Sequence, residues 1–263
     1  MKDAILSALS PDYPWKDSFY WFDSVDSTNT YLKTAARQGA AHGTVAVANC
    51  QTGGKGRLGR SFQSPGGVGV YLSMLLRPQC PPEELMHLTC AVGAAMCDAL
   101  EQASGLRPGI KWTNDLVYGH KKAAGILTEL GTSPEGLYAV VGIGVNCCQG
   151  PLDFPQELRD RATSLTTETG HPIDRASVAA AMMEALYRMD RELLTQKDAM
   201  LRQYKQDCVT LGKEISLVRG EQISHGLALD IGDNGDLIVR FSDGHVEAVS
   251  SGEVSVRGMY GYV

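Results

Sequence analysis

The segment from residue 51 to residue 67 constrains the fold more strongly than any other part of the chain. Its sequence is QTGGKGRLGRSFQSPGG, with six glycines and one proline. Two runs of small, β-branched and apolar residues, 44–50 and 68–76, flank it and predict buried strands. Because this density of glycine and proline cannot form a helix, a loop must join the two strands, and a crossover helix is excluded.

The same segment contains Gly54, Gly56 and Gly59 in the spacing G-x-G-x-x-G, which also occurs in dinucleotide-binding folds. The residues after Gly59 cannot continue as a helix, and no strand ends in an acidic residue about twenty positions further on. The phosphate-binding sequence G-x-x-x-x-G-K-[ST] is absent as well. The first two observations argue against a dinucleotide-binding fold. An NAD-dependent oxidoreductase is an alternative that rests on this one motif alone.

Charge is distributed unevenly along the chain. The net charge is −6, which argues against broad nucleic-acid binding. From residue 27 to residue 82, however, there is no Asp or Glu, and six basic residues give this window a charge of +6, leaving −12 for the rest. The basic residues are Lys33, Arg37, Lys55, Arg57, Arg60 and Arg77. We expect a mobile cationic loop that closes over a small anionic ligand.

The remaining pattern predicts a larger N-terminal domain and a small β domain. Helices are expected over residues 28–38, 82–103 and 175–207, and paired strands over 124–130 and 137–145. After residue 212, short alternating segments are separated by the hairpin-turn dipeptides Asn234-Gly235 and Asp243-Gly244. These indicate a β-barrel of about five strands. The domain boundary is expected near residue 210, giving domains 1–210 and 211–263.

Composition indicates a cytoplasmic protein with no membrane segment. No apolar run approaches the length of about 18–20 residues that a membrane span needs. The N-terminus does not resemble an export signal, and the seven cysteines include no C-x-x-C pair that could hold zinc. The six histidines show no metal-ligand spacing. Reduced thiols are the expected state of the cysteines.

A second group of polar residues lies between residues 111 and 127. Its first part is K-W-T-N-D, from Lys111 to Asp115, at a corner between two short predicted strands. Its second part, K-A-A-G-I-L, places Lys122 at the start of a strand and Gly125 within it. A lysine there can reach a pocket, while glycine allows another group to approach the backbone closely.

Taken together, these motifs resemble the catalytic domain of biotin–protein ligases. Five elements occur in the order of that family over about 120 residues. They are S-T-N at 27–29, the glycine–arginine loop at 51–60, K-W-x-N-D at 111–115, K-x-x-G-I-L at 122–127 and G-x-G-x-N at 142–146. The resemblance implies an α/β (α+β) fold: a mixed β-sheet flanked by helices, like class II aminoacyl-tRNA synthetases, followed by a small SH3-like β-barrel.

The resemblance also implies an ATP-dependent biotin–protein ligase. Such an enzyme activates biotin as biotinyl-5'-AMP and transfers it to a lysine of a biotin carboxyl carrier domain, with ATP and Mg²⁺ as further requirements. No residue is assigned as a Mg²⁺ ligand, and a monomer or a homodimer is equally compatible. Because only 26 residues, with five acidic and two basic side chains, precede the first motif, we expect no DNA-binding repressor domain.

Site residues follow from the matching motifs. Those expected to act in catalysis are Lys122, Arg57, Asp115 and Lys111. Those expected to bind biotin are Ser27, Thr28, Asn29, Gln51, Gly54, Lys55, Gly56, Arg57, Lys122, Gly125 and Gly142. Those expected to bind ATP are Arg57, Arg60, Lys111, Asn114 and Asn146. In this scheme Lys122 holds the biotin carboxylate, Arg57 and Lys55 hold phosphate, and Asp115 steers or deprotonates the attacking lysine.

The sequence departs from the family pattern at three positions. Thr113 replaces a proline, and Leu58 and Lys55 stand where arginine is often found. We expect these changes to alter loop stiffness and retention of the adenylate. Two alternatives remain within the fold: a lipoate or octanoate ligase or transferase, and a biotin-binding sensor without catalysis. The presence of Arg57, Lys122 and Asp115 argues against the sensor.

Overall fold

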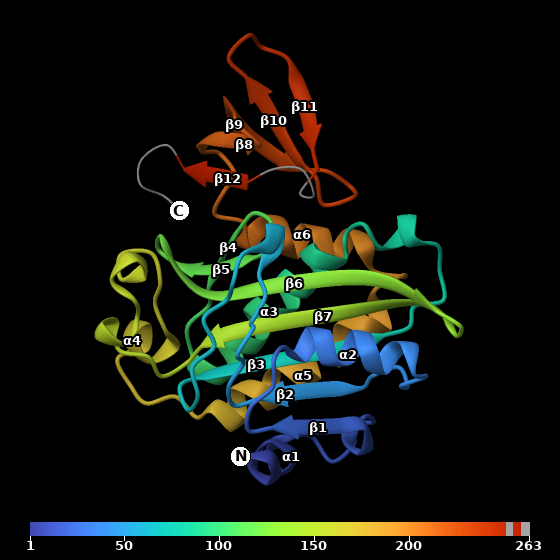
Figure 1. Cartoon of the computed structure of the whole chain (residues 1–263). Coiled ribbons are helices and arrows are strands. Elements are labelled where there is room, and N and C mark those ends of the chain that lie inside the picture. Colours follow the sequence, from blue (N-terminus) through green and yellow to red (C-terminus); the bar gives the residue numbers. More distant parts are fainter. Residues whose placement is uncertain (251–254, 259–263) are drawn as a thin grey trace.

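Seven strands form the larger of two sheets in the computed structural model, which describes residues 1–250 and 255–258 (Figure 1). Their order is β1-β2-β3-β7-β6-β5-β4. The bounds are β1 Phe19–Phe22, β2 Val45–Ala48, β3 Gly69–Leu76, β4 Gly109–Lys111, β5 Asp115–Tyr118, β6 Lys121–Ser133 and β7 Gly136–Asn146. Strand β1 pairs in parallel with β2, and all other neighbours are antiparallel, so the predicted mixed sheet is confirmed.

Strands β2 and β3 are the two runs that flank the glycine-rich segment, and they pair antiparallel as the loop connection requires. The predicted pair of strands after residue 124 is the β6–β7 hairpin at the centre of the sheet. In its register Gly125 lies opposite Gly144, and Leu127 lies opposite Gly142. Because side chains alternate between faces, these glycines lie on one face of the hairpin, and that face carries few side chains.

Helices cover the two faces of the sheet unequally. Their bounds are α1 Lys2–Ala8, α2 Thr28–Arg37, α3 Leu88–Ser104, α4 Leu165–Thr169, α5 Arg175–Glu192 and α6 Lys197–Asp207. The short 3₁₀ turns are η1 Lys16–Ser18, η2 Arg57–Gly59, η3 Pro82–Leu85, η4 Pro151–Asp153 and η5 Gln156–Leu158. Helices α3 and α5 pack on one face, and α2 packs on the other, over β2, β3 and β7.

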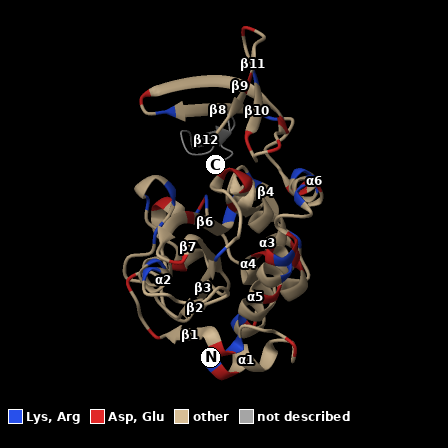
Figure 2. Cartoon of the chain, turned by 90° about the vertical axis from the view of Figure 1, so that its right-hand side faces the viewer, with Lys and Arg blue, Asp and Glu red and all other residues tan. Residues whose placement is uncertain are grey.

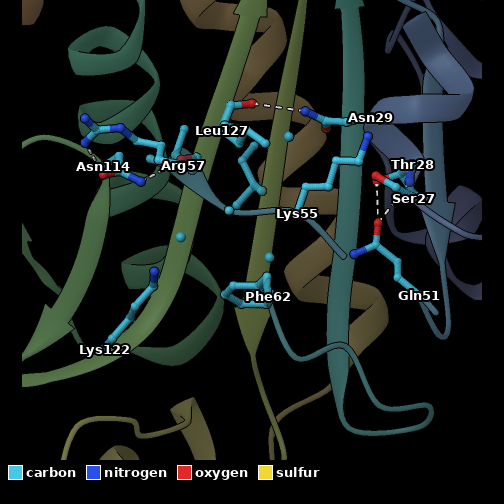
Figure 3. A pocket seen from close by; sticks show the side chains of 16 residues that line it. Ser27, Thr28, Asn29, Gln51, Lys55, Arg57, Phe62, Asn114, Lys122 and Leu127 are labelled. Carbon is cyan, nitrogen blue, oxygen red and sulfur yellow. Dashed lines mark hydrogen bonds between the residues drawn. The ribbon is translucent and has the colours of Figure 1, made fainter. Parts of the chain in front are cut away.

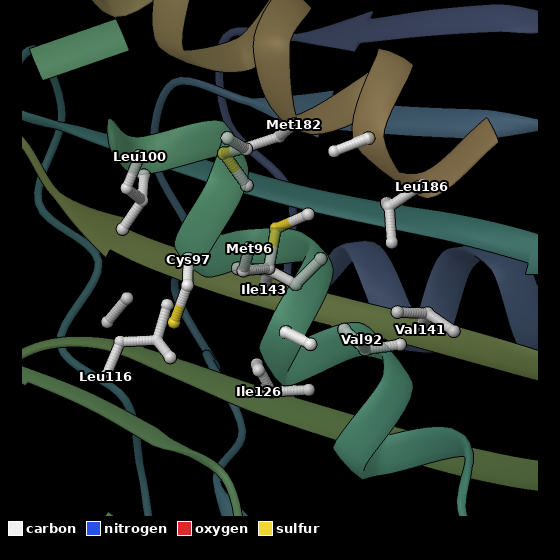
Figure 4. Close-up of a cluster of buried hydrophobic side chains, with 14 of the residues drawn as sticks. Val92, Met96, Cys97, Leu100, Leu116, Ile126, Val141, Ile143, Met182 and Leu186 are labelled. Atoms are coloured by element: carbon white, nitrogen blue, oxygen red, sulfur yellow. The ribbon is translucent and has the colours of Figure 1, made fainter. Parts of the chain in front are cut away.

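The main hydrophobic core lies between α3, α5 and the sheet (Figure 4). Met96 and Leu100 of α3 meet Leu186 of α5 and Ile143 of β7, and all four side chains are at most 3% exposed. A smaller cluster, which includes Leu32, Leu75 and Val140, lies beneath α2. The alternation of β7 therefore places its large apolar residues against α3 and α5 and its glycines on the opposite face.

The prediction of one helix over residues 175–207 is wrong, because α5 and α6 are separate. The amides of Thr195 and Gln196 both donate to the carbonyl of Glu192, which closes a turn after α5. Nε2 of the buried His87 donates to the carbonyl of Leu193 at 3.1 Å. The change of direction lets α6 bury Tyr204 beneath Thr113. A tertiary contact ends the helix where the sequence has no glycine or proline.

The helix predicted over 82–103 begins later than expected. Residues Pro82–Leu85 form η3, and α3 starts at Leu88. Helix α2 begins where it was predicted, since Ser27 is its N-cap and accepts a hydrogen bond from the amide of Thr30. Its end, at Arg37, lies one residue before the predicted end.

The C-terminal part forms a second, antiparallel sheet in the order β11-β10-β9-β8-β12. Its strands are β8 Glu214–Arg219, β9 Gln222–Ile231, β10 Leu237–Phe241, β11 Val246–Val249 and β12 Ser255–Gly258. The two predicted hairpin glycines, Gly235 and Gly244, have positive φ angles of 81° and 91°. The predicted small β domain is thus confirmed, while its residues 251–254 and 259–263 lie outside the described residues. Among the described residues no helix is long and apolar enough to cross a membrane.

Candidate functional site

The candidate site lies on the sheet face that carries α2, where the β6–β7 hairpin is bare. Gly125 of β6 and Gly142 and Gly144 of β7 leave room above the backbone, and a first pocket of about 470 Å³ opens there (Figure 3). Its lining combines α2, the glycine-rich segment and both hairpin strands. The lining residues are Ser27, Thr28, Asn29, Gln51, Lys55, Gly56, Arg57, Phe62, Asn114, Lys122, Gly125, Ile126, Leu127, Gly142, Ile143 and Gly144.

The N-terminus of α2 supplies the polar end of this pocket. Thr28 donates hydrogen bonds from its amide and its hydroxyl to Oε1 of Gln51, at 2.9 and 3.1 Å. Nε2 of Gln51 donates to the Ser64 hydroxyl at 3.0 Å. Ser73 Oγ lies 2.7 Å from the Thr28 hydroxyl and 2.6 Å from Oδ1 of Asn29. These bonds fix the positions of side chains that are otherwise free to rotate.

Asn29 reaches across β7 because position 142 is glycine. A Cβ atom at position 142 would lie 2.0 Å from Oδ1 of Asn29. Nδ2 of Asn29 donates to the Leu127 carbonyl at 3.3 Å and to the Glu129 carboxylate at 2.9 Å. Burial alone would raise the pKa of Glu129, but hydrogen bonds from Lys33 and Asn29 lower it below its ordinary value. The ion pair between Lys33 and Glu129, at 2.6 Å, thereby ties α2 to β6.

The glycine-rich segment folds into a short hairpin over the site. The amide of Gly56 donates to the carbonyl of Arg60 at 2.7 Å, and that of Phe62 donates to the carbonyl of Gly54 at 2.9 Å. Leu58, at its tip, has a φ of 56° and is 59% exposed. The hairpin points Lys55 and Arg57 toward the pocket (Figure 3).

A second pocket of about 630 Å³ adjoins the first on the side of β4 and β5. The residues that line it are Gly56, Arg57, Leu58, Arg60, Ser61, Phe62, Lys111, Trp112, Asn114, Asp115 and Lys122. Five residues line both pockets: Gly56, Arg57, Phe62, Asn114 and Lys122. The wall between the two cavities is therefore built from the cationic loop and the 111–122 region.

Arg57 crosses from the loop to the corner between β4 and β5. Its guanidinium donates to Oδ1 of Asn114 at 2.9 Å. Asn114 is held in turn, because its Nδ2 donates to the Ile126 carbonyl at 2.8 Å. Burial lowers the pKa of Arg57, and the nearby Asp115 carboxylate opposes this effect. An arginine stays protonated at neutral pH despite such a shift, so it places a fixed positive charge at the wall.

Lys122 lies at the other side of the same wall. Its ammonium group is 2.6 Å from Oδ1 of Asp115 and 5.6 Å from the centre of the Phe62 ring. Its backbone is fixed by hydrogen bonds to the carbonyl of Arg161 and from the amide of Thr163. As expected from the sequence, Lys122 reaches the pocket from the start of β6.

The described structure brings most of the predicted site residues together. Fourteen of the sixteen line the two pockets, and the two exceptions are Gly54 and Asn146. The fourteen are Ser27, Thr28, Asn29, Gln51, Lys55, Gly56, Arg57, Arg60, Lys111, Asn114, Asp115, Lys122, Gly125 and Gly142. Gly54 lies within the hairpin, where a Cβ would be 2.4 Å from the Phe62 carbonyl. Asn146 uses its amide to bond the Thr163 carbonyl and Gln149, away from both cavities.

Three residues that contribute to the site were not singled out from the sequence. Phe62 packs over Gly144, where a Cβ would lie 2.4 Å from its ring, and Leu127 lines the first pocket. The buried Ser73 joins Thr28 to Asn29. The alternation along β7 could have indicated Gly144, since it shares a face with Gly142.

The acid-free window from residue 27 to residue 82 supplies cations for two purposes. Lys55, Arg57 and Arg60 line the pockets, whereas Lys33 and Arg77 pair with Glu129 and Glu135. Elsewhere, acidic and basic residues are mixed, as along α5 and α6 (Figure 2). The second pocket contains four basic side chains and only one carboxylate, that of Asp115. Such a pocket favours a strongly anionic ligand.

Comparison with known proteins finds matches over both parts of the chain. Residues 21–146 match the Biotin/lipoate A/B protein ligase family, and residues 210–257 match the Biotin protein ligase C terminal domain. The chain is 34% identical over 239 residues to the biotin--[acetyl-CoA-carboxylase] ligase of Paracoccus denitrificans, covering 89% of this chain and 98% of the relative. It is 32% identical over 238 residues to the bifunctional ligase/repressor BirA of Bacillus subtilis, covering 90% of this chain and 73% of the relative.

Solved structures give the same result. The biotin protein ligase from Aquifex aeolicus in complex with biotin and ATP has a TM-score of 0.79 and 32% identity, covering 91% of this chain and 98% of the other. The resemblance predicted from the sequence motifs is confirmed by these matches.

Proposed function

The chain belongs to the biotin protein ligase family, and we propose that its two adjoining pockets hold biotin and ATP while the two are joined. The enzyme is an ATP-dependent ligase that forms biotinyl-5'-AMP and then transfers the biotinyl group to a lysine of a carrier domain. The contacts below support a role for each pocket.

The first pocket suits biotin. We call the end of the pocket at the N-terminus of α2 its inner end. This end presents the hydroxyl and amide groups of Thr28, Asn29 and Gln51, and a buried polar ring such as the ureido group needs such partners. The other end, which we call the outer end, is lined by the cationic side chains of Arg57 and Lys122, which attract a carboxylate. An octanoyl chain has no ring, and the dithiolane ring of a lipoyl group has no N–H or C=O to place at the inner end, so the pocket favours biotin.

The second pocket suits ATP. Arg57, Arg60, Lys111 and Lys122 together match the charge of a triphosphate. Mg²⁺ enters with ATP as part of the substrate, since it commonly keeps phosphate oxygens and waters as ligands. In the part of the chain that the structure describes, no group of three or more His, Cys, Asp or Glu side chains could hold a metal ion by itself.

The observation that carries this proposal is that Arg57 and Lys122 line both pockets. A carboxylate in the first pocket and an α-phosphate in the second would meet between these two cations. The carboxylate oxygen attacks the α-phosphorus, a new P–O bond forms, and the P–O bond to pyrophosphate breaks. Negative charge accumulates at this point, and the two cations stabilise it.

In the second step, the amine of an acceptor lysine attacks the carbonyl carbon of the mixed anhydride. An amide bond forms, the C–O bond to AMP breaks, and the amine loses a proton. Asp115 lines the second pocket and forms an ion pair with Lys122 at 2.6 Å, and we assign it the steering of the amine and acceptance of its proton. The relative named biotin--[acetyl-CoA-carboxylase] ligase supports a biotin carboxyl carrier domain as the acceptor.

The chain is further proposed to act in the cytoplasm and to consist of a catalytic domain, 1–210, and a C-terminal domain, 211–263. All seven cysteines, including Cys50, are free thiols, which suits a reducing compartment. The change from the mixed sheet to the antiparallel sheet after α6 supports the domain division.

Intact-mass spectrometry of a carrier domain tests the proposed reaction. The purified protein is incubated with MgATP, biotin and a biotin carboxyl carrier domain, and the carrier should gain one biotinyl group. A carrier whose acceptor lysine is replaced by arginine should gain none, and omission of ATP should also abolish the product. A different result would contradict the proposal. If the carrier stays unmodified in the complete mixture, and a lipoyl domain is modified when lipoate replaces biotin, the protein belongs to the lipoate side of the family.

A further inference from the structure

Trp112 joins the second pocket to the C-terminal domain. Trp112 lines that pocket, yet it is only 4% exposed. Its Nε1 donates a buried hydrogen bond of 2.9 Å to the carbonyl of Gly235, in the turn between β9 and β10. A buried indole N–H needs an acceptor, and here the acceptor comes from a residue 123 positions later. The orientation of the pocket wall therefore depends on this turn.

The backbone around Trp112 is also held by later parts of the chain. The amide of Trp112 donates to the Thr210 hydroxyl at 2.9 Å, and the carbonyl of Thr113 accepts from the Tyr204 hydroxyl at 3.0 Å. The carbonyl of Ile110 accepts from the amide of Val209 at 2.9 Å. The residues that make these three backbone contacts lie in α6 or just after it. The turn at Gly235 adds the contact to the Trp112 side chain.

The turn itself fits tightly against the start of α3. Gly235 has a φ of +81°, and a Cβ at this position would lie 2.8 Å from Sγ of Cys90. His87 and Met86 are its next neighbours, at 3.8 Å. Both the backbone conformation and the available space therefore require glycine. A larger residue would have to displace the turn or the buried Cys90 side chain, whose Sγ also faces the carbonyl that Trp112 uses.

We propose that the β9–β10 turn is a positioning element for the nucleotide: through the Gly235 carbonyl it sets the orientation of Trp112 and thereby the affinity of the second pocket for ATP. This inference rests on the assignment of that pocket to ATP. Gly235 lines neither described pocket and acts through Trp112. The first pocket, which Trp112 does not line, should keep its affinity for biotin when the turn is disturbed.

Gly235→Ala, compared with Gly244→Ala, tests the proposal. Gly244 has a similar positive φ of +91° in the next hairpin turn, but a Cβ there would meet nothing within 4 Å. The control thus carries the same backbone strain without displacing the Trp112 contact. In biotin-dependent ATP–pyrophosphate exchange, Gly235→Ala should raise the KM for ATP about tenfold, the effect of leaving one buried donor unpaired. Gly244→Ala should leave this KM unchanged.

Biotin affinity, measured by calorimetry, separates positioning from general damage. We expect it to be unchanged in Gly235→Ala and in Trp112→Phe, which keeps an aromatic wall but removes the donor. Trp112→Phe should raise the KM for ATP to a similar extent. If the KM for ATP is the same in Gly235→Ala and Gly244→Ala, or if biotin affinity falls in parallel, the proposal is wrong. Absence of exchange in the unaltered protein would instead overturn the proposed function.

Discussion

At the scale of single residues, the two cations at the wall between the pockets are held in different ways. Arg57 is held by a neutral amide, Asn114, and burial lowers its pKa without removing its charge at neutral pH. Lys122 is held by a carboxylate, Asp115, at 2.6 Å. A lysine is a compact charge on a flexible stem, so Asp115 limits its movement until an anion arrives. The two side chains are therefore placed before the substrates meet.

Removal of the Lys122 charge should slow adenylate formation. We expect Lys122→Ala to reduce the rate of biotinyl-5'-AMP formation by at least about 10²-fold, as is typical when a charge-stabilising group is lost. Lys121→Ala is the matched control, because Lys121 precedes it on β6 and lines neither described pocket. Single-turnover measurement with both substrates at saturation separates the chemical step from binding. Equal rates in the two variants would remove Lys122 from the proposed step.

Gly142 should control, through Asn29, the first pocket, which we propose binds biotin. In Gly142→Ala the new Cβ would lie 2.0 Å from Oδ1 of Asn29, so that this side chain must leave its network of hydrogen bonds. We expect biotin affinity to fall about tenfold or more, as measured by calorimetry. The control is Gly150→Ala, where the nearest atom would be at the ordinary contact distance of 3.5 Å. Undiminished affinity in Gly142→Ala would show that Asn29 does not contact biotin.

At the scale of secondary-structure elements, tertiary contacts decide where helices end and which strand face is used. His87 lies just before α3 and bonds the carbonyl of Leu193 just after α5, so it joins the ends of two helices. This contact permits the change of direction into α6. Helix α6 then supports the 111–115 region from behind, through Tyr204.

The buried His87 predicts a loss of stability in acid. Burial lowers the pKa of His87 below its ordinary value of 6.5. The unfolded chain therefore takes up a proton near pH 6.5, while the folded protein does not, and the free energy of unfolding should fall as the pH drops from about 6.5 toward the folded pKa. Urea unfolding at pH 7.5 and 5.5 measures this effect. The free energy of unfolding should fall less between these pH values in His87→Gln, which keeps an N–H donor, than in the unaltered protein.

His120→Gln is the control for this pH effect, since His120 is exposed in the turn between β5 and β6. It should retain the loss of stability seen in the unaltered protein. The same loss in His87→Gln as in His120→Gln would mean that another group is responsible.

Local sequence rules predicted the elements that depend on periodicity and turn chemistry. The β6–β7 hairpin, the N-cap Ser27 and the glycine turns at 235 and 244 are such elements. The break between α5 and α6 was missed because it depends on His87, which lies about a hundred residues earlier. Phe62 was missed for a similar reason: its place over Gly144 depends on the conformation of a loop without periodicity.

At the scale of the whole molecule, the two faces of the larger sheet have separate roles. One face buries its apolar side chains beneath α3 and α5, and the other leaves glycines bare beside α2, where the pockets open. The acid-free window brings cations to this second face although the net charge of the chain is −6. The C-terminal domain reaches the same region through the turn at Gly235. The main hydrophobic core and the two pockets thus lie on opposite faces of one sheet.

The central claim is that biotin and ATP meet between Arg57 and Lys122. ATP–pyrophosphate exchange with the purified protein tests it most directly, with biotin, lipoate, octanoate or no acid added. Exchange should occur with biotin alone, because only biotin has both a carboxylate for the outer end of the first pocket and a polar ring for its inner end. Exchange with lipoate or octanoate, or none with biotin, would contradict the account.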